Sequence, residues 1–171
     1  LAADVRAAAV ARTVPLSVRR YQSPAVCATG ALVSGGGLLL TTYEAVRGAE
    51  GVDATLPGNR RISQEIRVVA WDIPRNLAVL QLPGAGADSL APAPVVVPGQ
   101  FAFALGFRDC RTAAETRARL ANVAGPAIEL ADSINPSERA APLIDGQGRL
   151  VGILSAPRRA ASLLAVQELL A

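Results

Sequence analysis

The chain of 171 residues contains no histidine, no lysine and no methionine. Without histidine it lacks the side chain that most often acts as a general base near neutral pH, and also the commonest metal ligand. All 17 basic residues are arginines, and a guanidinium does not lose its proton in proteins. Because there is no methionine, Leu1 is not a translation start, and we expect any signal peptide or anchor to precede it.

Aromatic residues, long apolar runs and charge of one sign are also scarce. Aromatic side chains make up 4% of the chain, which is poor for stacking on sugar rings, and no apolar run reaches the roughly 18 residues that span a bilayer. The net charge of +3 comes without a long run of one sign, so no footprint for nucleic acid is indicated. We therefore expect no nucleic-acid partner, no membrane span and no small-molecule substrate. The arginine pairs at 19–20, 60–61 and 158–159 are interpreted as solvated side chains.

The chain is nevertheless rich in apolar residues, at 51%, which is enough to bury a core. The alanine-rich residues 2–13 predict a short helix that ends before Pro15. Two sets of short apolar or alternating runs follow, separated by glycine and proline turns, and such runs are typical of antiparallel β-structure. The runs are 16–21, 25–34, 38–42, 52–56, 62–71 and 77–82 in the first set, and 101–106, 117–123, 127–131, 142–144, 150–155 and 163–166 in the second.

These runs predict an all-β fold of two six-stranded antiparallel β-barrels with a short N-terminal helix. The composition shifts to proline, glycine and alanine between the two sets, which indicates a linker. We expect a helix and lead-in over 1–15, a first barrel over 16–84, the linker over 85–98 and a second barrel over 99–171.

Three segments carry recognisable motifs in a fixed order. They are GALVSGGGLLLTTYEAV at 30–46, NLAVL at 76–80, and INPSERAAPLID at 134–145, which is followed by GRLVGI at 148–153. These segments resemble the landmarks of the HtrA/Deg family of trypsin-like serine proteases, namely GSGxIxSxxGxILTNxHVV, DLAVL and INPGNSGGPLVN. The resemblance covers nearly the whole chain and implies the trypsin-like pair of barrels. It ends where many relatives begin a PDZ domain, so we expect none here.

The resemblance also identifies the positions of the family's catalytic triad. Glu44 stands at the position of the histidine, Asn76 at that of the aspartate and Arg139 at that of the serine. A glutamate, with a reference pKa of about 4.3, is roughly two units weaker as a base than imidazole, and arginine offers no nucleophile. Since the whole chain lacks histidine, no shift of the alignment restores the base. The resemblance therefore implies a catalytically inactive pseudoprotease without a cofactor.

The loop around the serine position is altered as well. Ser137, Ala140 and Ala141 stand where the family motif has glycines, and Glu138 stands where it has asparagine. Residues with a Cβ atom penalise any positive-φ backbone that an oxyanion hole needs. If Glu44 and Arg139 face each other across the cleft, we expect them to form an ion pair.

Cys27 and Cys110 are the only thiols, and two cysteines without histidine cannot supply the four ligands of a zinc site. They are either bonded to each other or buried as small apolar side chains. The even count and the family's extracytoplasmic setting favour a disulfide. The expected location is accordingly the bacterial periplasm or cell surface.

Three functions from different classes remain open at this point. The first is a non-catalytic structural or adaptor subunit that binds other proteins in an extracytoplasmic assembly. The second is a regulatory or chaperone-like module that binds peptides through the cleft or a strand edge, beside an active protease. The third is an enzyme with an acidic site, in which Glu44 pairs with Asp72, Asp132 or Glu138 as in glycoside hydrolysis.

Overall fold

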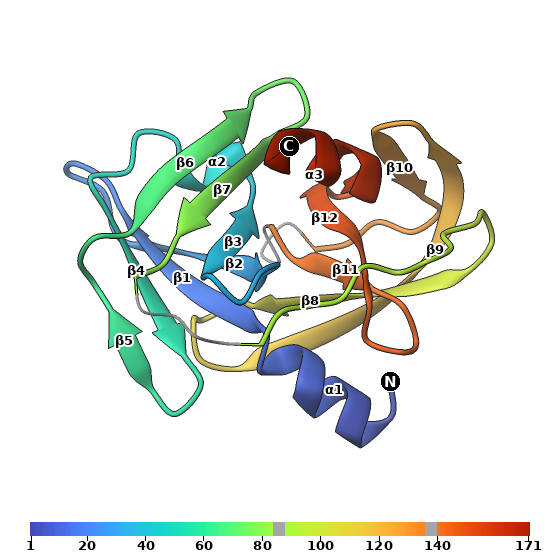
Figure 1. Cartoon of the computed structure of the whole chain (residues 1–171), viewed down its shortest axis with the longest axis horizontal. Helices are drawn as coiled ribbons and strands as arrows, with labels where there is room; N and C mark the ends of the chain where they lie inside the picture. The colour runs from blue at the N-terminus through green and yellow to red at the C-terminus, as the bar shows by residue number, and fades with distance from the viewer. Residues whose placement is uncertain (84–87, 136–139) are drawn as a thin grey trace.

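The computed structural model describes residues 1–83, 88–135 and 140–171, which form two β-sheets side by side with three short helices (Figure 1). The first sheet and its helices comprise α1 (Ala3–Val10), β1 (Thr13–Arg19), β2 (Val26–Leu32), β3 (Leu38–Thr41), α2 (Tyr43–Val46), β4 (Gly51–Leu56), β5 (Arg60–Ile62), β6 (Arg67–Asp72) and β7 (Leu77–Gln81). The second comprises β8 (Phe101–Phe107), β9 (Ala113–Ala124), β10 (Ala127–Leu130), β11 (Pro142–Ile144), β12 (Leu150–Ala156), β13 (Arg159–Ser162) and α3 (Leu163–Leu170). None of the described helices is long and apolar enough to cross a membrane.

The second sheet is a closed barrel of six strands, in the order β10-β13-β12-β11-β8-β9, as predicted. The first sheet differs from the predicted six-stranded barrel. It has seven strands in the order β5-β4-β1-β2-β3-β7-β6, and it curls without closing. The predicted single run over 62–71 is divided into β5 and β6, and these two strands form the edges of the sheet.

The structure also corrects the predicted element boundaries near the two ends of the chain. The helix α1 ends at Val10, and β1 already begins at Thr13, whose hydroxyl donates to the Ala9 carbonyl at 2.8 Å. Pro15 therefore lies inside a strand, but β4 pairs with β1 only from Leu16 onward, so Pro15 has a strand neighbour on one side alone.

The predicted strand over 163–166 is wrong, because these residues begin α3. The last strand of the barrel is β13, which ends at Ser162. The Ser162 hydroxyl then caps the helix by accepting the Ala165 N–H at 3.4 Å. A short apolar run such as Leu-Leu-Ala-Val fits a buried strand and a buried helix equally well.

Three apolar clusters hold the fold together. One fills the first sheet around Leu16, Leu39 and Leu80, and a second fills the closed barrel. The third lies between the sheets and joins side chains of both to the helices α1 and α3. Its largest buried members include Leu40, Leu77, Leu105, Ile144 and Ile153. The third cluster therefore packs the two sheets against each other, and this packing sets the position of the cleft between them.

The described part of the predicted linker, residues 88–98, is bonded to both sheets. The Leu90 N–H donates to the Leu32 carbonyl of β2 at 2.8 Å. Ala93 N–H then donates to the Leu150 carbonyl at 2.8 Å, and Leu150 N–H donates to Ala91 at 2.7 Å. These bonds hold the segment against both halves of the molecule.

Candidate functional site

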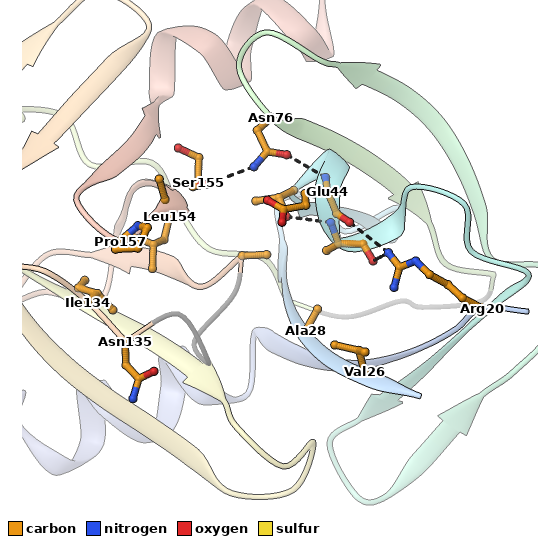
Figure 2. A pocket seen from close by; sticks show the side chains of 14 residues that line it. Arg20, Val26, Ala28, Glu44, Asn76, Ile134, Asn135, Leu154, Ser155 and Pro157 are labelled. Carbon is orange, nitrogen blue, oxygen red and sulfur yellow. Dashed lines mark hydrogen bonds between the residues drawn. The ribbon is translucent and has the colours of Figure 1, made fainter. Parts of the chain in front are cut away.

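A cavity of about 240 Å³ lies between the two sheets, and Figure 2 shows the side chains around it. The first sheet and α2 contribute Arg20, Val26, Ala28, Thr42, Glu44, Ala45 and Asn76. The second half contributes Ile134, Asn135, Ala140, Leu154, Ser155, Ala156 and Pro157. Most of these side chains are small and apolar, and the polar ones come mainly from α2 and its neighbours. The structure thus brings two of the predicted triad positions into one cavity.

Glu44 lies in the first turn of α2, a helix of four residues whose ends are both held by side chains. At its N-terminus the Thr42 hydroxyl accepts the Ala45 N–H at 3.3 Å, and the Asn76 side-chain oxygen accepts the Glu44 N–H at 2.8 Å. At its C-terminus Arg20 donates to the carbonyls of Glu44, Ala45 and Arg47 at 3.1, 2.9 and 2.9 Å. The Glu44 side chain is exposed, and its carboxylate has no hydrogen-bond or ion-pair partner among the described residues.

Asn76 joins the two halves of the molecule across the cleft. Its side-chain oxygen accepts from Glu44 of α2, and its side-chain NH₂ donates to the Ser155 carbonyl of β12 at 3.2 Å (Figure 2). Its backbone is left-handed, with φ of 56°, a conformation that asparagine adopts more readily than most residues. The neutral amide supplies both the acceptor and the donor that these two partners require, whereas an ionised carboxylate supplies only the acceptor.

The loop at the predicted oxyanion position is described only in part. Ala140 lines the cavity, is 2% exposed and has a left-handed backbone with φ of 61°. Ala141 is fully buried in the core of the closed barrel. Ser137, Glu138 and Arg139 lie outside the described residues. The ion pair between Glu44 and Arg139 therefore stays a prediction.

The predicted disulfide between Cys27 and Cys110 is confirmed, with a Cα–Cα distance of 5.5 Å. Cys27 belongs to β2, and its neighbours Val26 and Ala28 line the cavity. Cys110 follows β8 of the closed barrel. The bond therefore ties the two sheets together beside the cleft.

The sequence comparison and the structural comparisons agree on the fold. A family model described as trypsin-like peptidase domain matches residues 28–153, most of the chain. This chain belongs to that family. No curated protein sequence matches it.

Solved structures similar to this trypsin-like domain include proteases. The inactive form of the Rv3671c protease of M. tuberculosis has a TM-score of 0.79 at 20% identity, over 97% of this chain and 90% of that one. Deg5 has a TM-score of 0.81 at 18% identity, over 96% and 90% respectively. The serine endoprotease from Yersinia pestis has a TM-score of 0.80 at 17% identity, over 96% of this chain and 64% of that one. At such identities the similarity establishes the fold alone.

Among the described residues, the cavity of the trypsin-like domain does not pair Glu44 with Asp72 or Asp132, as considered for a glycosidase-type site, and Glu138 lies outside the described residues. Glu44 is the only carboxylate among the described residues that line it. Asp72 lies 3.6 Å from the Arg75 guanidinium, and Asp132 accepts the Arg119 backbone N–H at 3.0 Å. Within the described ranges, no three histidine, cysteine, aspartate or glutamate side chains are grouped as metal ligands would be.

Arg20, which binds the C-terminal carbonyls of α2, is the residue of the site that the sequence did not reveal. The interpretation of the arginine pairs as solvated side chains was therefore wrong in part. Arg20 holds α2, and Arg19 and Arg61 lie 3.5 and 2.8 Å from the buried Asp53 carboxylate. Arg158 donates to the Ala131 carbonyl at 2.6 Å. No signal in the sequence identifies such partners, since backbone carbonyls accept from any arginine that the fold brings near.

Replacing Ala140 by glycine is expected to raise the free energy of unfolding by about 0.5 to 1 kcal/mol. Alanine at φ of 61° bears the steric cost of the left-handed region, which glycine does not, although glycine loses more backbone entropy on folding. Urea unfolding of the wild-type protein and Ala140→Gly would measure the difference. Ala114→Gly, in a regularly paired part of β9 with a half-buried side chain, is the control and should instead destabilise. A destabilised Ala140→Gly variant would contradict the left-handed backbone.

Asp109 holds the turn that presents Cys110, and it gives a pH-dependent prediction. Backbone N–H groups of Thr112 and Arg111 donate to its carboxylate at 2.8 and 3.0 Å, and these bonds lower the pKa of Asp109 in the folded protein. A lowered pKa contributes stability above the unfolded-state value, and this contribution is lost as the pH falls below about 4. We expect Asp109→Asn to be less stable than wild type at pH 7, with the difference vanishing in acid. Urea unfolding at a series of pH values checks this; a difference that persists unchanged in acid would contradict it.

Proposed function

We propose that this trypsin-like domain is a catalytically inactive pseudoprotease that acts as a structural or adaptor subunit of an extracytoplasmic assembly. The observation that carries the proposal is the pair of residues at the cleft, Glu44 and Asn76, in a chain without a single histidine. A serine protease of this fold needs an imidazole base and a carboxylate that orients it. Here the base position carries an exposed carboxylate, and the orienting position carries an amide whose hydrogen bonds are both used for structure.

The hydrogen bonds of Asn76 support a structural role for this residue, which stands where the family has its catalytic aspartate. Its NH₂ group is committed to the Ser155 carbonyl and its oxygen to the N-terminus of α2. The side chain is thus bonded to both halves of the domain. This structural role supports a domain that functions through its fold and its surface instead of through catalysis. The disulfide supports a location outside the cytoplasm.

The apolar lining of the cavity favours a second candidate, a regulatory or chaperone-like module that binds peptides. Val26, Ile134 and Leu154 from the two halves line the space between the sheets. Extended peptides bind such clefts through backbone pairing and a few side-chain pockets. This candidate predicts binding of many unrelated unfolded peptides, whereas an adaptor binds one partner in a fixed ratio.

The purified domain is expected to show no labelling by a fluorophosphonate probe, because its chain has no imidazole to activate a serine. The variant Arg139→Ser should stay unlabelled for the same reason. An active trypsin-like protease treated in parallel is the positive control. Covalent labelling of any serine in the wild-type protein would disprove the proposed inactivity.

Native purification separates the two binding roles. An adaptor should elute with one partner at a constant ratio, and a mixture of unfolded peptides should not compete with that partner. A chaperone-like module should bind the peptides with micromolar affinity and elute alone. Loss of the affinity for peptides in Val26→Asp, a change at a 37% exposed side chain of the cavity, would replace the adaptor role by the peptide-binding one.

A further inference from the structure

The strand β6 and the turn after it expose an apolar surface that the proposed function does not use. Trp71, the only tryptophan, is 57% exposed, and Val69 and Ile73 are 51% and 58% exposed. Val69 and Trp71 are two positions apart in β6, so the strand directs them to one side, and Ile73 follows in the turn after the strand. The register of β6 shifts between Val68 and Ala70, so strict alternation does not extend to Val68. Val68 is also exposed. We call these four residues the β6 face, and none of them is among the described residues that line the cavity.

The β6 face lies at the edge of its sheet. The strand order ends with β6, so β7 is its only strand neighbour among the described elements (Figure 1). Edge strands of soluble proteins usually place charges or proline in their middle to prevent association. Here the four residues between Arg67 and Asp72 are Val-Val-Ala-Trp, without a charge. An uncharged apolar edge of this kind indicates a surface that is covered in solution.

The charges at the two ends of β6 are opposite, which favours a second, identical β6 strand as the partner. Arg67 at one end is exposed and has no carboxylate partner among the described residues. At the other end Arg75 lies 3.6 Å from Asp72 and is also paired with Glu168 of α3, so two carboxylates share a single guanidinium. That end is therefore net negative. An antiparallel arrangement of two identical strands places each positive end against a negative one.

We propose that the β6 face is the contact between two copies of this chain in solution. The copies are related by a two-fold axis, with their β6 strands antiparallel. Trp71 of each copy packs on Val68 and Val69 of the other, and Arg67 of each approaches the Asp72 and Glu168 carboxylates of the other. The irregular register of β6 between Val68 and Ala70 disturbs a continuous backbone ladder, so the contact is made by side chains.

Sedimentation velocity on the purified chain tests this contact, which does not depend on the proposed function. A contact centred on four apolar side chains is smaller than the roughly 800 Å² per partner of a standard interface, so we expect a weak dimer. Its dissociation constant should be about 10 to 100 μM, measured over concentrations that bracket this range. Trp71 emission should shift to shorter wavelength as the dimer forms, because the indole then leaves water.

The variants separate this contact from any other association. Trp71→Glu and Arg67→Glu should each raise the dissociation constant at least about tenfold. Adding Glu168→Arg to Arg67→Glu should recover part of the affinity, because it restores opposite charges across the two-fold axis. Val95→Glu changes a valine that is 66% exposed and lies outside the β6 face, and it should leave the affinity unchanged. A wild-type chain that stays monomeric at the highest concentration, or a dimer insensitive to Trp71→Glu, would overturn the proposal.

Discussion

Replacing both Cys27 and Cys110 by alanine is expected to lower the free energy of unfolding by roughly 4 to 5 kcal/mol. The bond joins residues 83 positions apart, and the loop that it closes contains most of the first sheet, the linker and β8. In the unfolded chain it therefore removes much of the freedom of both halves. Total stabilities of such domains are about 5 to 15 kcal/mol, so the variant should unfold at far lower denaturant concentration. Urea unfolding followed by far-ultraviolet circular dichroism gives the measurement.

Two controls isolate the bond from the side chains. The wild-type protein in reductant should unfold like the double variant, and the reductant should leave the double variant itself unchanged. Cys27→Ser with Cys110→Ser should behave like the alanine pair, since both cysteines are only half-buried. Equal unfolding midpoints with and without reductant, or two free thiols in the unreduced denatured protein, would contradict the predicted stabilisation.

The sequence predicted the strand number and closure of the second sheet better than those of the first, although it missed β13 and placed a strand where α3 begins. In β8 the buried Ala102 and Ala104 alternate with the exposed Phe101 and with Phe103, which is half-buried against the cluster between the sheets, so the alternation of a strand is clear. In β6 the residues Val68, Val69 and Trp71 are apolar but exposed. Apolar patterning indicates which residues prefer burial, and it gives no indication of which strand ends a sheet. The division of the run over 62–71 into two edge strands therefore required the structure.

The site was predictable only where a motif was present. Glu44 and Asn76 are 32 residues apart, and their contact followed from the family resemblance of their two segments. The motifs did not indicate that the Asn76 NH₂ group binds Ser155, because this contact depends on how the second barrel packs against the first. The positive φ of Ala140 was foreseen as a cost, since the family motif has glycine at that position.

Asn76→Asp would place the family's aspartate at this position, and it is expected to lower the free energy of unfolding by about 2 to 3 kcal/mol at neutral pH. The bond from the Glu44 N–H is retained, because a carboxylate oxygen accepts it as well as an amide oxygen does. The second contact is lost, because an ionised carboxylate has no hydrogen to donate to the Ser155 carbonyl 3.2 Å away. Two oxygens then face each other at the junction of the two sheets. Urea unfolding of the variant would measure the cost.

Asn59→Asp is the matched control, since Asn59 has the same left-handed backbone, with φ of 58°, in an exposed turn. The change of amide to carboxylate there should cost less than about 0.5 kcal/mol, because no contact between the sheets depends on it. A variant Asn76→Asp as stable as Asn59→Asp would show that the amide does not join the two halves. If the predicted cost is found, the triple variant Glu44→His, Asn76→Asp and Arg139→Ser has a triad but lacks the hydrogen bond from residue 76 to Ser155. The contact between the two sheets that form the cleft is then weaker. Any residual activity of that triple variant should then be limited by stability, and should increase when the protein is cooled toward its temperature of maximum stability.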